Sequence, residues 1–450
     1  MKKIKVNAEL YIGDDKLATV KDINDNIDNS VQDYMKKNPS QSCSPYVKEY
    51  DNEIILTNHD EPIYLKSNTR YSGHGTVFKT TSTAKHHVAD VMTNPHPESG
   101  GVRPWTENII IEGFIFDGDS ENVPGDIMTH VIMLAIYQCR NVTIRNCIFR
   151  NSKGAYIICH TCSDILIEDC HFYGGDSCIN GDSMSYKENI TIRNCYFDGE
   201  LNGKYTVSES ITMKGAKNVK IESNYIMNKQ ATCCAMAVRC DTVKMINNTF
   251  RSLGAVLCGV RECTNVDISN NTLYGDDYEK CYYGIGVCDS QGVVSNNKIY
   301  DVRHSSIYVN STALLGNSEH TVETDILLRD NIMENAVNPD AWTNPILIQG
   351  WGRIRIIRNE LYKYVSNHWS IVSIRDFTNP TDGDVECNIS IINNIFDDTV
   401  NIVGFADALS SRDDIKINLD VRANIGNLSY KNLLDRGYTP YICELKQVTN

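Results

Sequence analysis

The sequence predicts an all-β fold, a single-stranded parallel β-helix, because one short phrase recurs along most of the chain. Residues 141–151 read NVTIRNCIFRN, and altered copies of this phrase return from near residue 108 to near residue 398. Each copy contains two short segments of alternating apolar and polar residues around a polar corner, and a third apolar segment lies between copies. Three short strands per repeat without a helical period are typical of a β-helix, and we expect about 13 coils.

Length and charge narrow the class of protein. Length alone would predict two or three domains for 450 residues. A solenoid grows along one axis, so a single domain accounts for most of this chain. The 43 Lys plus Arg stand against 57 Asp plus Glu, which argues against a nucleic-acid partner. No stretch of about 18 apolar residues occurs, so we expect no insertion into a membrane.

The N-terminal sequence and the cysteines both predict synthesis in a reducing compartment. The start, MKKIKVNAELYIGDDKLATV, has no apolar run of signal-peptide length, so we expect synthesis in the cytoplasm. Most of the 17 Cys lie inside the repeats, where they alternate with Val, Ile and Met as small buried apolar residues do. We therefore expect free thiols rather than a disulfide framework.

Residues 1–45 lack the phrase and form a separate N-terminal segment. Within it, residues 20–37 (VKDINDNIDNSVQDYMKK) place large side chains at helical spacing. These side chains are Ile23, Ile27, Val31 and Tyr34. The pattern predicts a short amphipathic helix, which either packs on the body or pairs with copies of itself.

The seventh position of the phrase predicts the interior of the corner. The residues at this position are Cys147, Cys170, Cys195, Asn224, Asn248, Asn271, Asn297, Asn331, Asn359 and Asn394. Coils stack at about 4.8 Å, the spacing of parallel strands, so these residues form one column. Stacked Asn amides bond to each other and to the bend, which satisfies buried polar groups. We expect the three Cys to stack as apolar residues.

The repeats and this column resemble the right-handed parallel β-helix superfamily of pectate lyases, polygalacturonases and phage tailspikes, over residues 55–425. In addition, VNAELYIGDDKLATVKDINDNID resembles the N-terminal attachment segments of bacteriophage tail proteins. These resemblances imply an attachment or oligomerisation segment at residues 1–45, a right-handed β-helix at residues 46–425 and a C-terminal cap or tail at residues 426–450. They also imply a place in the virion, on the phage tail, with tail or baseplate proteins as partners and a homotrimer as the assembly.

The candidate binding surface is a row of outward side chains, one per coil, which we call the file. The resemblance implies a substrate groove along the strand before the Asn corner. In each such strand the apolar residues point inward and the intervening residues point outward. The last outward residues, coil by coil, are His160, Asp182, Lys214, Arg239, Arg261, Cys288, Asn310, Gln349 and Arg375. Cations on three successive coils predict an anionic polymer, a cell-surface polysaccharide, as the partner.

Loops that enter the same face add carboxylates and aromatic rings. The motif FDGE supplies Asp198 and Glu200, and Trp351 is one of several aromatic residues near the later coils. Aromatic rings stack on sugar rings. The alternative interpretation is that carboxylates beside Gly form turns and that the Lys and Arg residues form a solvated surface.

Two enzyme mechanisms remain open. A polysaccharide lyase abstracts the proton beside a uronate carboxylate, so it needs cations and a base. The cationic candidates are Lys214, Arg239 and Arg261. The acidic partners, or the ligands of a Ca²⁺ ion, are Asp182, Asp198 and Glu200. A glycoside hydrolase instead needs two carboxylates that flank the bond, for which the candidates are Asp176, Asp182 and Asp198.

The segment GGDSCINGDSMSYKENITIRNC, which begins at Gly174, resembles a polygalacturonase stretch with a Gly-Asp-Asp-Cys core. It departs from that pattern at Ser177, where the second Asp belongs. No Gly-His-Gly or Arg-Ile-Lys motif follows on the later coils, which weakens the hydrolase interpretation.

Three hypotheses about function follow from the sequence. The first is a tail spike that binds and cleaves an anionic host glycan. The second is a non-catalytic adhesin or structural tail component, and the third is a bacterial polysaccharide lyase or hydrolase. The catalytic candidates are Asp182, Lys214, Arg239 and Asp198. The substrate-binding candidates are His160, Arg261, Glu200, Asn310, Gln349, Trp351 and Arg375.

Overall fold

The chain divides into two compact units, Met1–Tyr46 and Val47–Asn450. The computed structural model describes residues 9–12, 15–19, 46–57, 63–80, 88–93, 105–118, 130–152, 154–174, 177–181, 183–198, 209–228, 233–252, 256–275, 281–311, 322–334, 344–350, 352–362, 370–375, 385–396, 401–405, 415–422 and 424.

The described part of the first unit is a β-hairpin. β1 (Glu9–Ile12) pairs antiparallel with β2 (Asp15–Thr19). The sequence between the two strands is Gly13-Asp14, and a leading Gly favours a tight hairpin turn. Sequence reasoning did not predict this hairpin, and the helix predicted over residues 20–37 lies outside the described residues.

The second unit contains three ladders of parallel strands, and the first, sheet I, has 13 strands. These strands form the second half of the repeated phrase. They are β4 (Ile54–Thr57), β7 (Val77–Thr80), β10 (Ile115–Asp117), β12 (Ile148–Arg150), β14 (His171–Tyr173), β17 (Tyr196–Asp198), β20 (Tyr225–Asn228), β23 (Thr249–Ser252), β26 (Thr272–Gly275), β29 (Lys298–Tyr300), β32 (Ile332–Glu334), β35 (Glu360–Tyr362) and β38 (Ile395–Phe396).

Sheet II contains the strands that lie between copies of the phrase. They are β5 (Ile63–Tyr64), β8 (Val88–Thr93), the first part of β11 (His130–Arg145), the first part of β13 (Ile157–Glu168), β15 (Ser177–Gly181), β18 (Glu209–Lys214), β21 (Cys233–Val238), β24 (Val256–Arg261), β27 (Tyr283–Cys288), β30 (Ser305–Asn310), β33 (Ile346–Gln349), β36 (Ser370–Arg375) and β39 (Asn401–Phe405).

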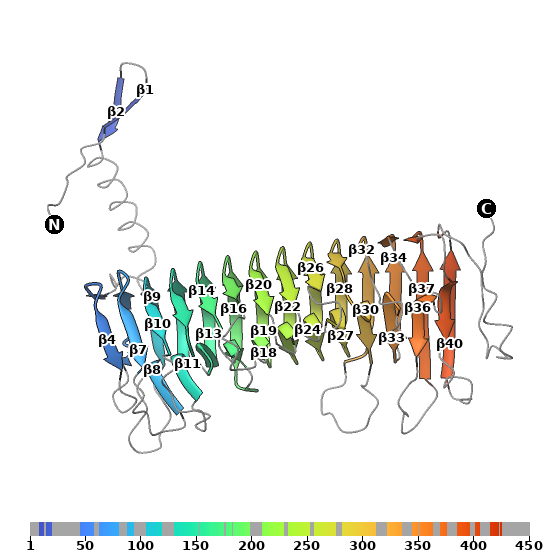
Figure 1. The fold of residues 1–450 in the computed structure, drawn as a ribbon, viewed down its shortest axis with the longest axis horizontal. Helices are drawn as coiled ribbons and strands as arrows, with labels where there is room; N and C mark the ends of the chain where they lie inside the picture. The colour runs from blue at the N-terminus through green and yellow to red at the C-terminus, as the bar shows by residue number, and fades with distance from the viewer. Residues whose placement is uncertain are drawn as a thin grey trace. The chain divides into compact units, whose positions relative to one another are not determined.

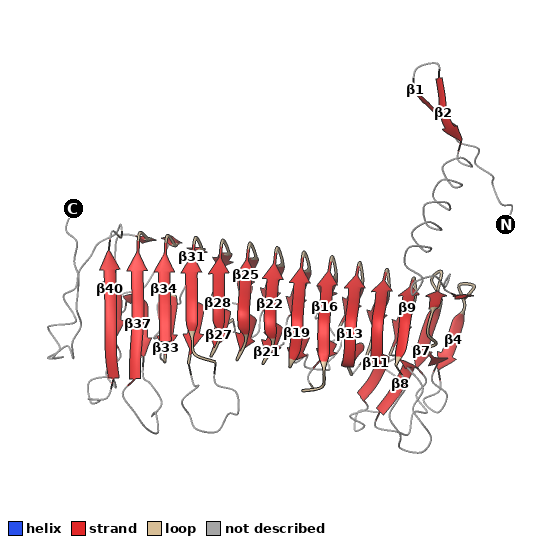
Figure 2. Cartoon of the chain, turned by 180° about the vertical axis from the view of Figure 1, so that it is seen from behind, coloured by secondary structure: helices blue, strands red, loops and turns tan. Residues whose placement is uncertain are grey.

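Sheet III contains the first half of the phrase, and its strands lie side by side along one axis (Figure 2). They are β3 (Tyr46–Glu49), β6 (Thr69–Ser72), β9 (Thr106–Glu112), the second parts of β11 and β13, β16 (Lys187–Arg193), β19 (Ala216–Glu222), β22 (Asp241–Ile246), β25 (Thr264–Ser269), β28 (Gln291–Ser295), β31 (Asp325–Arg329), β34 (Gly352–Ile357), β37 (Val385–Ile392) and β40 (Ile415–Arg422).

Each coil passes through the three sheets in a fixed order, from sheet II through sheet III to sheet I, as β18, β19 and β20 do. Every strand then pairs in parallel with its counterpart in the next coil, as β18 with β21 and β20 with β23. Successive coils therefore stack along one axis (Figure 1). This arrangement confirms the predicted right-handed parallel β-helix, with 13 strands in sheet I, one for each expected coil.

The core is a set of stacked columns of identical or similar side chains. Phe116, Phe149, Phe172 and Phe197 lie opposite one another in sheet I, and all are fully buried. Their ring centroids are 4.9, 4.9 and 4.6 Å apart, and the rings are nearly parallel. The contact distance of these rings matches the spacing between coils, so one residue type repeats at one position of the phrase.

The corner of the phrase requires a left-handed backbone. The sixth position has a positive φ coil after coil, 51° at Asn146, 52° at Asp169 and 52° at Asn194. Asn and Asp adopt this conformation more readily than other non-glycine residues. The polar residue before the column is therefore chosen by backbone geometry, and it turns the chain from sheet III into sheet I.

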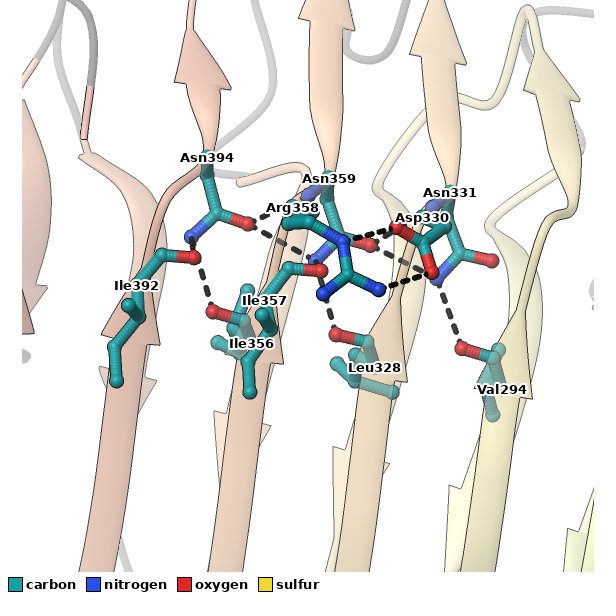
Figure 3. Close-up of polar contacts among 10 residues, drawn as sticks. All are labelled: Val294, Leu328, Asp330, Asn331, Ile356, Ile357, Arg358, Asn359, Ile392 and Asn394. Carbon is teal, nitrogen blue, oxygen red and sulfur yellow. Dashed lines mark hydrogen bonds and ion pairs between the residues drawn. The ribbon is translucent and has the colours of Figure 1, made fainter. Parts of the chain in front are cut away.

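The Asn column inside the corner is continuously hydrogen bonded (Figure 3). The amide Nδ2 of Asn331 donates to Oδ1 of Asn359 at 2.9 Å, and Nδ2 of Asn359 donates to Oδ1 of Asn394 at 3.0 Å. Each Oδ1 also accepts the backbone N–H of the preceding coil, at 3.0 Å for Asn331 to Asn359. The predicted ladder is confirmed, and it continues one step further than predicted, to Asn424.

The thiols that precede this ladder act as weak donors rather than only as apolar fillers. Sγ of Cys170 lies 3.7 Å from the carbonyl oxygen of Ile144, and Sγ of Cys195 lies 3.8 Å from that of Ile167. The Asn side chains donate Nδ2 to the same position of the preceding coil, as Asn224 does to Ile192 at 3.0 Å. Apolar stacking alone was therefore an incomplete prediction. The described cysteines are all free, as predicted.

Candidate functional site

Sheet II carries the predicted polar file, and the strand register defines its members. Successive pairings run through Lys214, Val238, Arg261, Cys288, Asn310, Gln349 and Arg375. Lys214, Asn310 and Gln349 are half-buried and Arg261 is exposed, as outward side chains at a sheet surface are. Of Arg375 only the backbone, in β36, is described.

Arg239 was wrongly placed in this file. Val238 occupies that position, and Arg239 lies one residue further along, at the corner between β21 and β22. Its φ is +53°, and its N–H donates to the carbonyl of Arg261 at 2.8 Å. Counting alternate residues along AMAVR fails here because the corner residue has left the extended strand conformation.

Arg239 instead joins Arg261 in an ion-paired triad around Glu262. Nε of Arg239 lies 2.6 Å from Oε2 of Glu262, and Nε of Arg261 lies 3.3 Å from Oε1. The Glu262 side chain is only 4% exposed, whereas those of Arg239 and Arg261 are 35% and 57% exposed. Sequence reasoning missed Glu262, although its place directly after an outward Arg at a corner was a visible signal.

His160 lies on β13 at the same outer surface. Its ring is 5.5 Å from that of Tyr137 on the preceding coil, and Nδ1 is 3.0 Å from Oγ1 of Thr161. Thr161 in turn donates its backbone N–H to Oγ of Ser185 at 3.1 Å. The histidine is thus placed beside the turn that joins β15 to β16. Asp176 and Asp182, which flank β15 in the sequence, lie outside the described residues.

A buried lysine organises that turn, and sequence reasoning missed it. Lys187 is 0% exposed, and its ammonium donates to the carbonyl oxygens of Ser183 and Ser185, the latter at 3.0 Å. Oγ of Ser185 accepts a further hydrogen bond from the same ammonium at 3.2 Å. Carbonyl dipoles thereby take the place of water around the charge. No motif in the sequence indicates this role.

Asp198 does not lie with Lys214. It ends β17 in sheet I, where it stands opposite Tyr173 and Met227, whereas Lys214 ends β18 in sheet II. The sequence suggested a loop because FDGE contains a turn-forming Gly, but the strand of the phrase extends to the Asp. The structure therefore does not bring these two catalytic candidates together on one strand surface. Glu200 and Trp351 lie outside the described residues.

Aromatic side chains gather where the file reaches β27 and β30. The rings of Tyr283 and Tyr308 stack at 4.8 Å, and those of Tyr282 and His304 stack at 4.5 Å. The Tyr308 hydroxyl donates to Oε1 of Gln349 at 2.8 Å. This contact links the aromatic cluster to a residue of the file.

The one file member with a thiol is chemically quiet at neutral pH. Burial raises the pKa of Cys288 to about 12, so the thiol stays protonated and uncharged. Within the described coils, no cluster of three or more His, Cys, Asp or Glu side chains is arranged to hold a metal ion. The Ca²⁺ alternative involves Asp182, Asp198 and Glu200. Asp182 and Glu200 are outside the described residues, so it stays a prediction. No described helix is long and apolar enough to cross a membrane.

Comparison with known proteins gives the fold and leaves the ligand open. Residues 132–285 match the family described as a right handed beta helix region. A double mutant of the tailspike protein of E. coli bacteriophage HK620 shares 12% sequence identity, with a TM-score of 0.53, 86% of this chain covered and 75% of that chain. A second mutant of that tailspike, in complex with pentasaccharide, has a TM-score of 0.51 at 12% identity, with 88% and 73% covered.

An adhesin has a lower structural similarity. The Streptococcus pneumoniae surface protein and adhesin PfbA has a TM-score of 0.47 at 16% identity, with 91% of this chain and 94% of that chain covered. No curated protein matches the sequence. Sequence identities this low are evidence for a shared fold only. Residues 132–285 thus match right-handed β-helix regions, and the described coils form a right-handed parallel β-helix.

Proposed function

We propose that sheet II binds an anionic polysaccharide that lies along the axis of the β-helix. The observation that carries this proposal is the file from Lys214 to Gln349, which presents one outward side chain per coil at intervals of about 4.8 Å. A repeating surface of this kind suits a repeating polymer. Lys214 and Arg261 supply charge, and the cluster around Tyr283 and Tyr308 supplies aromatic edges and hydroxyl groups.

The finer proposal is a phage or prophage tail spike that binds a host cell-surface glycan. A catalytic version of this proposal adds cleavage of the glycan. It is supported by the resemblance of the N-terminal segment to tail attachment segments. An adhesin or structural tail component with the same binding face, but without chemistry, is the alternative. Separation of Asp198 from Lys214 favours that alternative, because a lyase or hydrolase needs its acid and base at one bond.

Binding is tested with the full chain against a panel of acidic and neutral cell-surface polysaccharides, by calorimetry or affinity electrophoresis. We expect Lys214→Ala to weaken binding of an acidic polymer about tenfold. The matched control is Arg193→Ala, which removes an exposed cation paired with Glu168 on sheet III. Equal affinity of the wild type and Lys214→Ala would place the binding surface elsewhere.

Cleavage is tested in the same samples. New reducing ends report either lysis or hydrolysis, and ultraviolet absorbance of an unsaturated uronate reports lysis alone. If polymers bind but neither signal appears with any polymer of the panel, the protein binds the polysaccharide without cleaving it. Tail genes beside this one in its genome would support the virion location, and their absence would contradict it.

A further inference from the structure

The Arg239–Glu262–Arg261 triad has more hydrogen-bond donors than its carboxylate uses. Each guanidinium has five N–H donors. Arg239 donates its Nε–H to Glu262, and Arg261 forms an ion pair with Glu262 at 3.3 Å. In the described part of the chain neither arginine has another acceptor. Side-chain exposures of 35% and 57% leave the remaining Nη–H donors accessible to solvent. The triad therefore presents unused, charged donors from two adjacent coils.

The local charge balance is positive in an acidic protein. Glu262 neutralises one of the two guanidiniums, so the triad carries one net positive charge at neutral pH. Asp289, which is buried, follows Glu262 at the next corner, and Lys214 stands in the file two coils earlier than Arg261. The triad itself thus has an excess of one positive charge, whereas the whole chain carries a net charge of −14.

The carboxylate of Glu262 positions Arg239 through a hydrogen bond and attracts Arg261 through an ion pair. At 4% exposure it is little screened by water, and the hydrogen bond from Arg239 is short, 2.6 Å. Arginines fixed in advance lose less side-chain entropy when they bind a ligand than free surface arginines do. An anion from solvent can therefore bind to guanidinium groups that are already positioned.

We propose that Arg239 and Arg261, positioned by Glu262, form a receptor for the carboxylate groups of the polysaccharide on sheet II. This inference rests on the proposed function and names the ligand group that sheet II recognises. The planar guanidinium fork matches the two oxygens of a carboxylate. Lys214 and Arg261 are two coils apart, about 10 Å, so the favoured polymer carries acid groups that recur at about that distance.

The chain contains a second triad that serves as the control. On sheet III, Nε of Arg70 lies 2.6 Å from Oε1 of Glu112, and Nε of Arg145 lies 2.8 Å from Oε2. The Glu112 side chain is 11% exposed, so composition and burial resemble those of the Glu262 triad. Both triads join neighbouring coils. What distinguishes the Glu262 triad as a receptor is its place beside the file of sheet II, to which Arg261 belongs. Arg145→Ala therefore removes the same structural contact without touching the proposed ligand.

The test uses the full chain with uronate polymers, hyaluronan, alginate and polygalacturonate, each beside its carboxyl-reduced, neutral derivative. We expect the wild type to prefer an acidic polymer to its reduced form by about tenfold or more. Arg261→Ala and Arg239→Ala should each abolish that preference, while Arg145→Ala keeps it. Thermal unfolding of the three variants should shift by similar amounts, because each loses one ion pair to a largely buried carboxylate.

Each other outcome has a distinct meaning. Binding of acidic and reduced polymers with equal affinity leaves polysaccharide binding intact and overturns the receptor. The same holds if Arg261→Ala keeps the acidic preference. If Arg261→Ala fails to fold, Arg261→Lys retains the charge beside Glu262 and removes the paired donors, and a preserved preference in that variant overturns the receptor. Failure of the wild type to bind any of the polymers contradicts the proposed function as well.

Discussion

At the scale of single residues, the corner column shows how one side chain satisfies several buried groups at once. Oδ1 of Asn297 accepts the backbone N–H and the amide of Asn271, at 3.0 and 2.9 Å. Its Nδ2 donates to Ile268 and to Asn331, at 2.8 and 2.9 Å. The residue is 0% exposed, so water cannot replace any of these partners.

Loss of one ladder amide should therefore be costly. We expect Asn297→Ala to lower the free energy of unfolding by about 3 kcal/mol or more, because several buried donors and acceptors lose their partner together. Cys170→Ala, in the same column, removes only a weak thiol donor and should cost roughly 1–2 kcal/mol. Denaturant unfolding of both variants measures the difference. Equal losses would show that the column contributes by packing and not by hydrogen bonding.

Acid should weaken the triad around Glu112. Burial raises the pKa of this carboxyl, but the hydrogen bonds from Arg145 and Arg70 outweigh burial, and the pKa lies below its ordinary value. A carboxyl with a lowered folded pKa stabilises the fold above its unfolded pKa, and this contribution disappears as pH falls through the folded pKa. We expect the melting temperature to fall below about pH 4.5. Glu112→Gln should be less stable at pH 7 and lose less on acidification, and parallel melting curves would contradict this.

Sequence reasoning at this scale succeeded where a residue repeats and failed where it does not. The Asn column was predictable because each amide bonds to its own copy in the next coil. Arg239 was placed one residue out of register because a positive φ interrupts the in-and-out alternation. Lys187 could not be recognised because it bonds to backbone carbonyls and to a serine hydroxyl of its own turn, a combination that forms no sequence motif.

At the scale of elements, apolar alternation predicted the strands of each coil, and the backbone corners decide where they end. Gly292, the second residue of β28, has a φ of +151°, and a Cβ at this position would lie 2.1 Å from the carbonyl oxygen of Val266. Two neighbouring coils approach so closely there that no side chain fits. The hairpin of β1 and β2 was not predicted because it lies outside the repeat and has no second copy.

Two glycines on consecutive sheet strands should respond in opposite ways. Gly292→Ala forces the main chain of β28 away from β25, and we expect a loss of about 3 kcal/mol or more. Gly286→Ala lies on β27 with an ordinary φ, and its Cβ would meet only a methyl of Val256 at 3.6 Å. We expect a change of less than about 1 kcal/mol, with a gain in stability favoured. The melting temperatures of the two variants test this difference. Similar losses of stability in both variants would contradict the argument from coil spacing.

At the scale of the whole molecule, the described strands of each coil pair with those of the coils before and after it. Asp241 stands opposite Thr264, and Val243 opposite Val266, with the same offset along the strand. One coil is therefore an interchangeable unit, as in other solenoids.

Removal of a complete coil should leave a folded protein. Deletion of residues 241–263 joins Cys240 to Thr264 and lets β25 take the place of β22 next to β19. Each column keeps its residue type, since Asn271 then follows Asn224. We expect a β-sheet circular dichroism spectrum and a cooperative melt, together with loss of acidic-polymer preference, because Arg261 and Glu262 are removed. A deletion shifted by half a coil, residues 241–252, should not fold.

The change of the corner column from thiols to amides has a further consequence for how this protein can be observed. The described cysteines are buried except for Cys288, and burial raises the pKa of Cys170 and of Cys258 far above that of a free thiol. Such thiols react with alkylating reagents only when their coil opens. Every thiol that becomes labelled under mild heating therefore marks the place along the rod where unravelling has begun, and the chain contains its own set of positional reporters.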